Sequence, residues 1–109
     1  MESRESAMVP DVVERAVDLA RLCRRHRVLR LDLFGSASSG HYLPEGSDLD
    51  FLVEFQPLPA GVYADTYFGL LEALEQLFER PVDLVVGSTI KNPYFRQSVE
   101  ATRTPVYEA

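Results

Sequence analysis

The sequence predicts an α/β fold in which helices pack on one mixed β-sheet, with the elements in the order αβαβαβα. Apolar runs of strand length alternate along the chain with segments whose apolar residues recur at helical spacing. A chain of 109 residues is long enough for one hydrophobic core, and no internal repeat is visible. We therefore expect a single domain over residues 1–109, with residues 1–8 as a loose polar arm.

The first expected element is a helix that begins at Pro10, a residue suited to a first-turn position. Its apolar face is expected to comprise Val13, Ala16, Val17, Ala20 and Cys23. Because Cys23 is the chain's one cysteine and lies in this helix, we expect a small buried hydrophobe and not a nucleophile.

A strand is expected next over residues 28–34, where Leu29, Leu31 and Leu33 alternate with Arg30 and Asp32. It leads into a Gly-Ser turn and a short helix over residues 36–40. Residues 51–55 are apolar enough for a second, buried strand.

The second half of the chain predicts two helices, a strand between them and a short final strand. The first helix ends near Arg80, before Pro81, and its apolar face comprises Tyr67, Leu70, Leu71, Leu74, Leu77 and Phe78. Residues 82–86 form the strand, and the second helix runs over residues 93–102 with Asn92 as its cap. Residues 105–107 can form only an edge strand, because Pro105 has no N–H for a ladder.

The composition excludes several classes of function. A formal net charge of −6 argues against direct nucleic-acid binding, which depends on basic side chains, and favours a basic protein partner. The local basic cluster is assigned to a helix carboxyl end, where cations complement the dipole; it comprises Arg21, Arg24, Arg25, Arg27 and Arg30. No apolar run suits a membrane span and no leader pattern is present, so a cytoplasmic protein is expected.

The most informative motif is Gly35-Ser36, followed after eleven residues by Asp48-Leu49-Asp50. Residues at i and i+2 of a strand point to the same face, so Asp48 and Asp50 are expected to lie side by side. Such paired carboxylates suit Mg²⁺, which leaves other positions free for water and phosphate oxygens. A Gly-Ser turn that opens a helix offers backbone N–H groups to a triphosphate. Together the two features indicate nucleotidyl transfer.

These residues resemble the minimal nucleotidyltransferases (MNT) of the DNA polymerase beta superfamily, which carry Gly-Ser, a spacer and Asp-x-Asp. The family has a third carboxylate on a neighbouring strand, and Asp83 occupies such a place in the run 81–86. The segment 90–99 is similar to the ending of the MNT half of HEPN/MNT toxin–antitoxin pairs. The resemblance implies the small nucleotidyltransferase fold over nearly the whole chain. Two departures are a spacer one residue longer and Ser39 where the family often has arginine.

The resemblance also implies a mechanism and a partner. Two Mg²⁺ ions would be held by Asp48, Asp50 and Asp83, with Asp83 as a possible general base. Gly35, Ser36 and Ser47 would bind the nucleotide. The donor would be ATP, and AMP would pass to a tyrosine of a cognate HEPN ribonuclease toxin.

Two other functions stay open from the sequence. A binding antitoxin would neutralise its toxin by covering it, and Ser39 in place of arginine supports that alternative. Transfer of a nucleotide to a small molecule such as an aminoglycoside is the other. Its weakness is that no substrate-recognition domain is visible. His41, Tyr42 and Lys91 are weaker site candidates, because exposed loop positions explain them without function.

Overall fold

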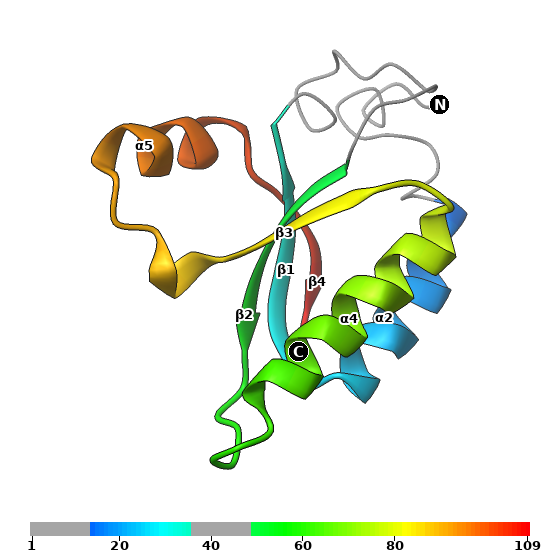
Figure 1. Ribbon diagram of the computed structural model, residues 1–109. Helices are drawn as coiled ribbons and strands as arrows, with labels where there is room; N and C mark the ends of the chain where they lie inside the picture. Colours follow the sequence, from blue (N-terminus) through cyan, green and yellow to red (C-terminus); the bar gives the residue numbers. More distant parts are fainter. Residues whose placement is uncertain (1–13, 36–48) are drawn as a thin grey trace.

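The computed structural model describes residues 14–35 and 49–109, which form a four-stranded mixed sheet (Figure 1). The strands are β1 (Val28–Phe34), β2 (Leu49–Phe55), β3 (Val82–Val86) and β4 (Thr104–Glu108). Their order across the sheet is β3-β2-β1-β4. β1 pairs antiparallel with β2 and β4, whereas β3 runs parallel to β2. The predicted α/β class with a mixed sheet is confirmed.

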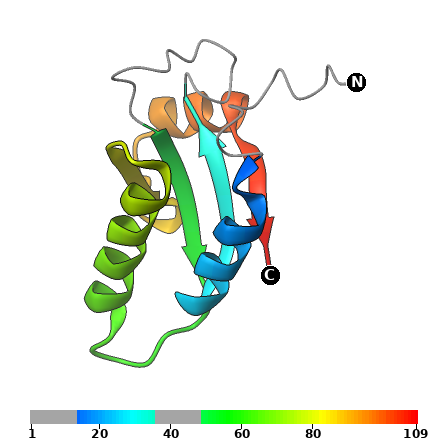
Figure 2. The ribbon, with the colours of Figure 1, turned by 90° about the vertical axis from the view of Figure 1, so that its right-hand side faces the viewer.

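Helices cover both faces of this sheet. The described helices are α2 (Ala16–Arg25), α4 (Tyr63–Phe78), α5 (Pro93–Thr102) and the 3₁₀ turn η2 (Gly87–Thr89). Figures 1 and 2 show α2 and α4 side by side on one face, while α5 lies on the other. No helix in these parts of the chain is long and apolar enough to cross a membrane.

The main core fills the space between the sheet and the α2/α4 pair. Its fully enclosed side chains include Leu19, Leu31, Leu33, Phe51, Val53, Leu70 and Leu74. The ring of Phe51 stacks on that of Phe78 with centroids 5.9 Å apart. A smaller cluster of Phe34, Leu52 and Val99 lies under α5. The side chains that alternate along β1 and β2 therefore face two different layers, and neither face is left to solvent alone.

Two apolar faces differ from their predictions. Val17 is 70% exposed, and the buried residues of α2 are Leu19 and Cys23. The helix thus buries a leucine in preference to the smaller valine, because the leucine removes more apolar area from water. In β1 the expected core residue Leu29 is 48% exposed, because the pairing with β2 is irregular between Val28 and Arg30. Such a bulge shifts the alternation by one residue.

Several local predictions are confirmed. β1, β3 and α5 have the predicted bounds, and Asn92 caps α5 by accepting from the Tyr94 and Phe95 N–H groups at 2.8 and 3.2 Å. Pro105 lies in β4, at the sheet edge. β2 begins at Leu49, two residues earlier than expected, and α4 ends at Phe78. The short helix expected over residues 36–40 lies outside the described residues.

Candidate active site

Asp50 and Asp83 are neighbours at one end of the sheet. Each is the second residue of its strand, and the two are direct partners in the parallel pairing of β2 with β3. Paired residues of adjacent strands project side chains to the same face from backbones about 4.8 Å apart. Asp50 is half-buried and Asp83 is exposed. The structure therefore brings together two of the three predicted carboxylates, with one side open to solvent.

Gly35 lies directly beside this pair, at the end of β1. Its neighbour Phe34 is the antiparallel partner of Asp50. Gly35 has a positive φ of 77°, and a Cβ atom on it would lie 2.5 Å from Asp50 Oδ2. A side chain at this position would thus combine an unfavourable backbone conformation with a clash. Glycine allows the turn to approach the carboxylate this closely.

Alanine variants of two glycines can separate the effect of the close approach to Asp50 from the effect of the left-handed backbone conformation. Gly61 has a similar φ of 87°, but a Cβ atom there would meet nothing within 4 Å. We expect Gly61→Ala to lose about 1 kcal/mol of unfolding free energy from the left-handed conformation. Gly35→Ala should lose about 1–3 kcal/mol more, because its Cβ displaces the Asp50 carboxylate. Urea denaturation of both variants measures the difference, and equal losses would show that the contact with Asp50 is unimportant.

The Gly35 amide has a partner that the sequence did not reveal. Its N–H donates to the Thr102 hydroxyl of α5 at 3.0 Å. This amide was expected to face a phosphate group, and in the structure it binds a side chain 67 positions away. No local pattern marks Thr102, since a threonine at the end of a helix is unremarkable in sequence.

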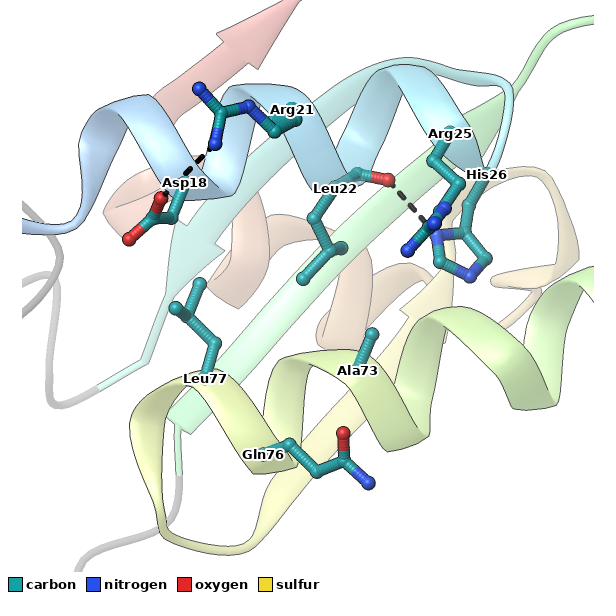
Figure 3. Close-up of a pocket in the computed structure, with 8 residues that line it drawn as sticks. All are labelled: Asp18, Arg21, Leu22, Arg25, His26, Ala73, Gln76 and Leu77. Carbon is teal, nitrogen blue, oxygen red and sulfur yellow. Dashed lines mark hydrogen bonds and ion pairs between the residues drawn. The ribbon is translucent and has the colours of Figure 1, made fainter.

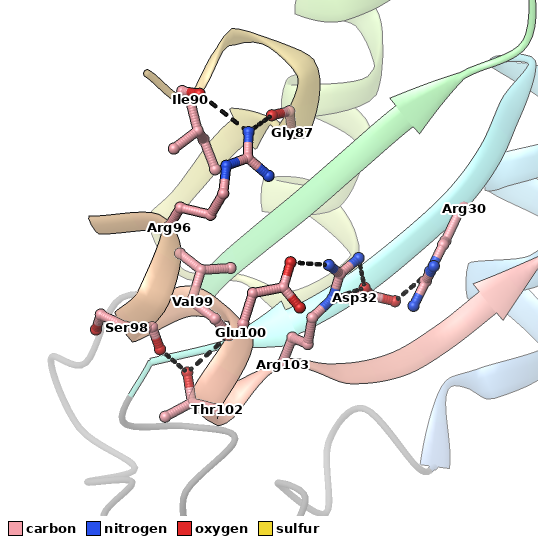
Figure 4. Close-up of polar contacts among 10 residues, drawn as sticks. All are labelled: Arg30, Asp32, Gly87, Ile90, Arg96, Ser98, Val99, Glu100, Thr102 and Arg103. Atoms are coloured by element: carbon pink, nitrogen blue, oxygen red, sulfur yellow. Dashed lines mark hydrogen bonds and ion pairs between the residues drawn. The ribbon is translucent and has the colours of Figure 1, made fainter. Parts of the chain in front are cut away.

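A buried ion pair lies next to this contact (Figure 4). Asp32 of β1 is fully buried, and its Oδ2 accepts from Arg103 Nε at 2.7 Å. Arg30 Nε lies 3.3 Å from the other carboxylate oxygen, and Arg103 also contacts Glu100 at 2.7 Å. Burial alone would lower the pKa of Arg103, but the hydrogen bond and charge of Asp32 raise it above the ordinary value. The guanidinium therefore stays charged and holds the end of α5 to β1.

Tyr67 supports the strand that carries Asp83. Its hydroxyl, on α4, donates to the backbone carbonyl oxygen of Leu84. The pKa of this hydroxyl is raised, mainly by burial and to a smaller extent by the nearby charge of Asp83. Tyr67 was predicted only as a core residue, and it also ties α4 to the acidic end of β3.

The remaining predicted site residues are only partly described. Ser36, Ser47 and Asp48 lie outside the described residues, as do His41 and Tyr42, so their placement stays a prediction. Lys91 is exposed, in the segment between η2 and α5. Within residues 14–35 and 49–109, no three His, Cys, Asp or Glu side chains group closely enough to hold a metal ion.

The Asp50/Asp83 pair still offers the hard oxygen ligands that Mg²⁺ prefers, and Mg²⁺ commonly takes only one or two protein carboxylates. The pair therefore fits one such ion beside a nucleotide. A second ion would need the third predicted carboxylate, Asp48.

A groove of about 510 Å³ between α2 and α4 lies on the face opposite α5 (Figure 3). Leu22, Ala73 and Leu77 form its apolar part, and Arg21, Arg25 and His26 contribute polar groups. It holds neither Asp50 nor Asp83. The nearby Cys23 is buried, and desolvation raises the pKa of its thiol to about 12, against the opposing charge of Arg24. This supports the prediction that Cys23 is a packing residue.

Comparison with known proteins defines the class. The family model for the nucleotidyltransferase domain matches residues 19–105, which include Gly35 and the two neighbouring carboxylates Asp50 and Asp83. The chain therefore belongs to the nucleotidyltransferase domain family.

Individual relatives refine this assignment. A Methanocaldococcus jannaschii protein named "Putative protein adenylyltransferase MJ1379" is 36% identical over 76 residues, which cover 70% of this chain and 74% of that protein. A solved structure described as a "putative minimal nucleotidyltransferase" superposes with a TM-score of 0.70 at 33% identity, covering 86% of this chain and 91% of that one. Within its family, the chain is a minimal nucleotidyltransferase.

A more distant structure shares the fold. It is a tri-AMPylated Shewanella oneidensis HEPN toxin in complex with an MNT antitoxin, and the matching chain has a TM-score of 0.60 at 17% identity. The match covers 90% of this chain and 73% of that one.

Proposed function

We propose that this nucleotidyltransferase is an antitoxin that transfers AMP from ATP to a tyrosine hydroxyl of a cognate HEPN toxin. The observation that carries the proposal is the pairing of Asp50 with Asp83 beside the Gly35 turn. Two adjacent carboxylates next to a turn with no side chain suit a polyphosphate and its counter-ion. The adenylyltransferase relative supports AMP as the transferred group, and the HEPN–MNT complex supports a protein acceptor.

Under this proposal, different residues would bind the metal ion, the nucleotide and the acceptor. Asp48, Asp50 and Asp83 would hold Mg²⁺, which when bound neutralises phosphate charge and orients the reacting oxygens. The absence of a side chain at Gly35 leaves room for the Asp50 carboxylate, while Ser36 and Ser47 would bind phosphate oxygens. Asp83 is exposed, and an acceptor from solvent can therefore reach it.

The transfer itself would proceed by in-line displacement. The acceptor's hydroxyl oxygen forms a bond to the α-phosphorus of ATP, and the bond from that phosphorus to the bridging oxygen breaks. Pyrophosphate leaves with the bonding electrons, and Asp83 takes the hydroxyl proton as general base. The products are an AMP–tyrosine phosphodiester and pyrophosphate.

The test is to determine the mass of the toxin after co-expression with this chain. We expect the toxin to gain one or more AMP units and to remain inactive after this chain is removed under denaturing conditions and the toxin is refolded. As a control, toxin that was never co-expressed should recover its ribonuclease activity after the same procedure. Unmodified mass with full recovery would instead support neutralisation by covering.

A further inference from the structure

The Thr102 hydroxyl makes one hydrogen bond within its own helix and a second one to Gly35. A threonine hydroxyl has one hydrogen and two lone pairs, so it can donate once and still accept. The Thr102 hydroxyl donates to the Ser98 carbonyl oxygen at 3.2 Å within α5 and accepts from the Gly35 N–H at 3.0 Å. Figure 4 shows the first of these bonds at the end of the helix. The acceptor lone pair is thereby turned toward β1.

The end of α5 that carries this hydroxyl is anchored to the same strand. Arg103, the next residue, binds the buried Asp32. Phe34, between Asp32 and Gly35 in the chain, meets the ring of Phe95 edge-on at 6.1 Å. Contacts to two positions of β1, Asp32 and Phe34, thus hold α5 in place, and they fix the position of the Thr102 hydroxyl relative to Gly35.

We propose that Thr102 is a positioning residue for the nucleotide, because its hydroxyl fixes the Gly35 amide and with it the turn that faces Asp50. Gly35 is confined on two sides, by Thr102 at its N–H and by the Asp50 carboxylate where a Cβ would be. The Gly35 amide is consequently used within the protein and is not a phosphate donor. The inference rests on the proposed function, in which this end of the sheet binds ATP.

Two variants and a matched control isolate the hydroxyl. Thr102→Val keeps the branched shape and removes the acceptor, while Thr102→Ser keeps the hydroxyl. Thr66→Val is the control, because the Thr66 hydroxyl makes the same type of bond to its own helix, to the Val62 carbonyl oxygen at 2.8 Å, far from Gly35 in the fold. Both valine variants then lose a hydrogen bond from the hydroxyl to a carbonyl oxygen of the helix. Only Thr102→Val also loses the hydrogen bond with the Gly35 N–H.

The measurement is NMR on the full ¹⁵N-labelled chain, with Mg-ATP as the titrant. In Thr102→Val we expect the Gly35 amide to exchange with solvent faster and the Kd for Mg-ATP to rise about five- to tenfold, the effect of one hydrogen bond. Thr102→Ser and Thr66→Val should stay within about twofold of wild type. If Thr102→Val does not fold, Thr102→Ala removes the same hydroxyl without the branched methyl.

The possible failures are distinguishable. If wild type and Thr102→Val bind Mg-ATP equally, the positioning role is wrong while the proposed function stands. Tighter binding by Thr102→Val would show that Thr102 competes with phosphate for the amide, which also overturns the inference. Absence of Mg-ATP binding by wild type would overturn the proposed function and the inference together.

Discussion

Asp50→Asn should reduce AMP transfer by at least about 100-fold, because removal of one preorganised electrostatic group from an active site costs that much. Asp50 is half-buried between Gly35 and Asp83, so no other described carboxylate can replace it at this point of the sheet. The fold should survive, since neutralising one of two adjacent acids relieves repulsion. We expect the unfolding free energy to change by less than about 1 kcal/mol.

The rate is measured with α-³²P-ATP and the cognate toxin. Asp18→Asn is a suitable control, because Asp18 is an exposed carboxylate on α2 and takes no part in the strand pairing that brings Asp50 to Asp83. Labelling by Asp50→Asn at the wild-type rate would remove the basis for the site proposed here. Loss of labelling by both variants would point to a general defect in the proteins.

Arg103→Met should destabilise the protein by about 3–5 kcal/mol, the cost of removing the closer partner of a buried charge. Asp32 is fully buried, and after the change its nearest cation is Arg30 at 3.3 Å, whose side chain is 40% exposed. The methionine keeps most of the apolar stem of arginine, so the loss reports the charge and its hydrogen bonds more than packing.

Urea denaturation gives the unfolding free energy, with Arg21→Met as the matched control. Arg21 lies 3.9 Å from Asp18 and both side chains are more than half exposed, so that variant should lose at most about 0.5 kcal/mol. The double variant Asp32→Asn/Arg103→Met should be more stable than Arg103→Met alone, because no buried charge is left unpaired. Similar losses from the two arginine variants would contradict a structural role for the buried pair.

The sequence was informative where a local signal sets the structure. Asn92 and Pro93 determine where α5 begins, and the missing N–H of Pro105 is consistent with the edge strand. The proximity of Asp50 and Asp83 was also predictable, since each was expected near the start of a strand. Their catalytic role stays a proposal.

The other features of the fold and the site depend on tertiary contacts, which the periodicity of the sequence does not encode. Alternation along β1 shows that Asp32 faces away from Leu31, but not that α5 and Arg103 enclose that second face. The bulge at Leu29 is likewise invisible, because it arises from pairing with β2. The hydrogen bond between Thr102 and Gly35 could be recognised only after the sheet order and the position of α5 were known.

The Asp32–Arg103 pair has a consequence for the order in which the molecule assembles. It joins residues 71 positions apart, so forming it closes a long loop, and contacts of high sequence separation slow folding. Until α5 and β4 arrive, Asp32 must remain hydrated, because an unpaired carboxylate is costly to bury. The α5 face should therefore close late on the folding pathway. The end of the sheet that carries Gly35, which we propose binds the nucleotide, would then be completed by Thr102 only after the α2/α4 core has formed.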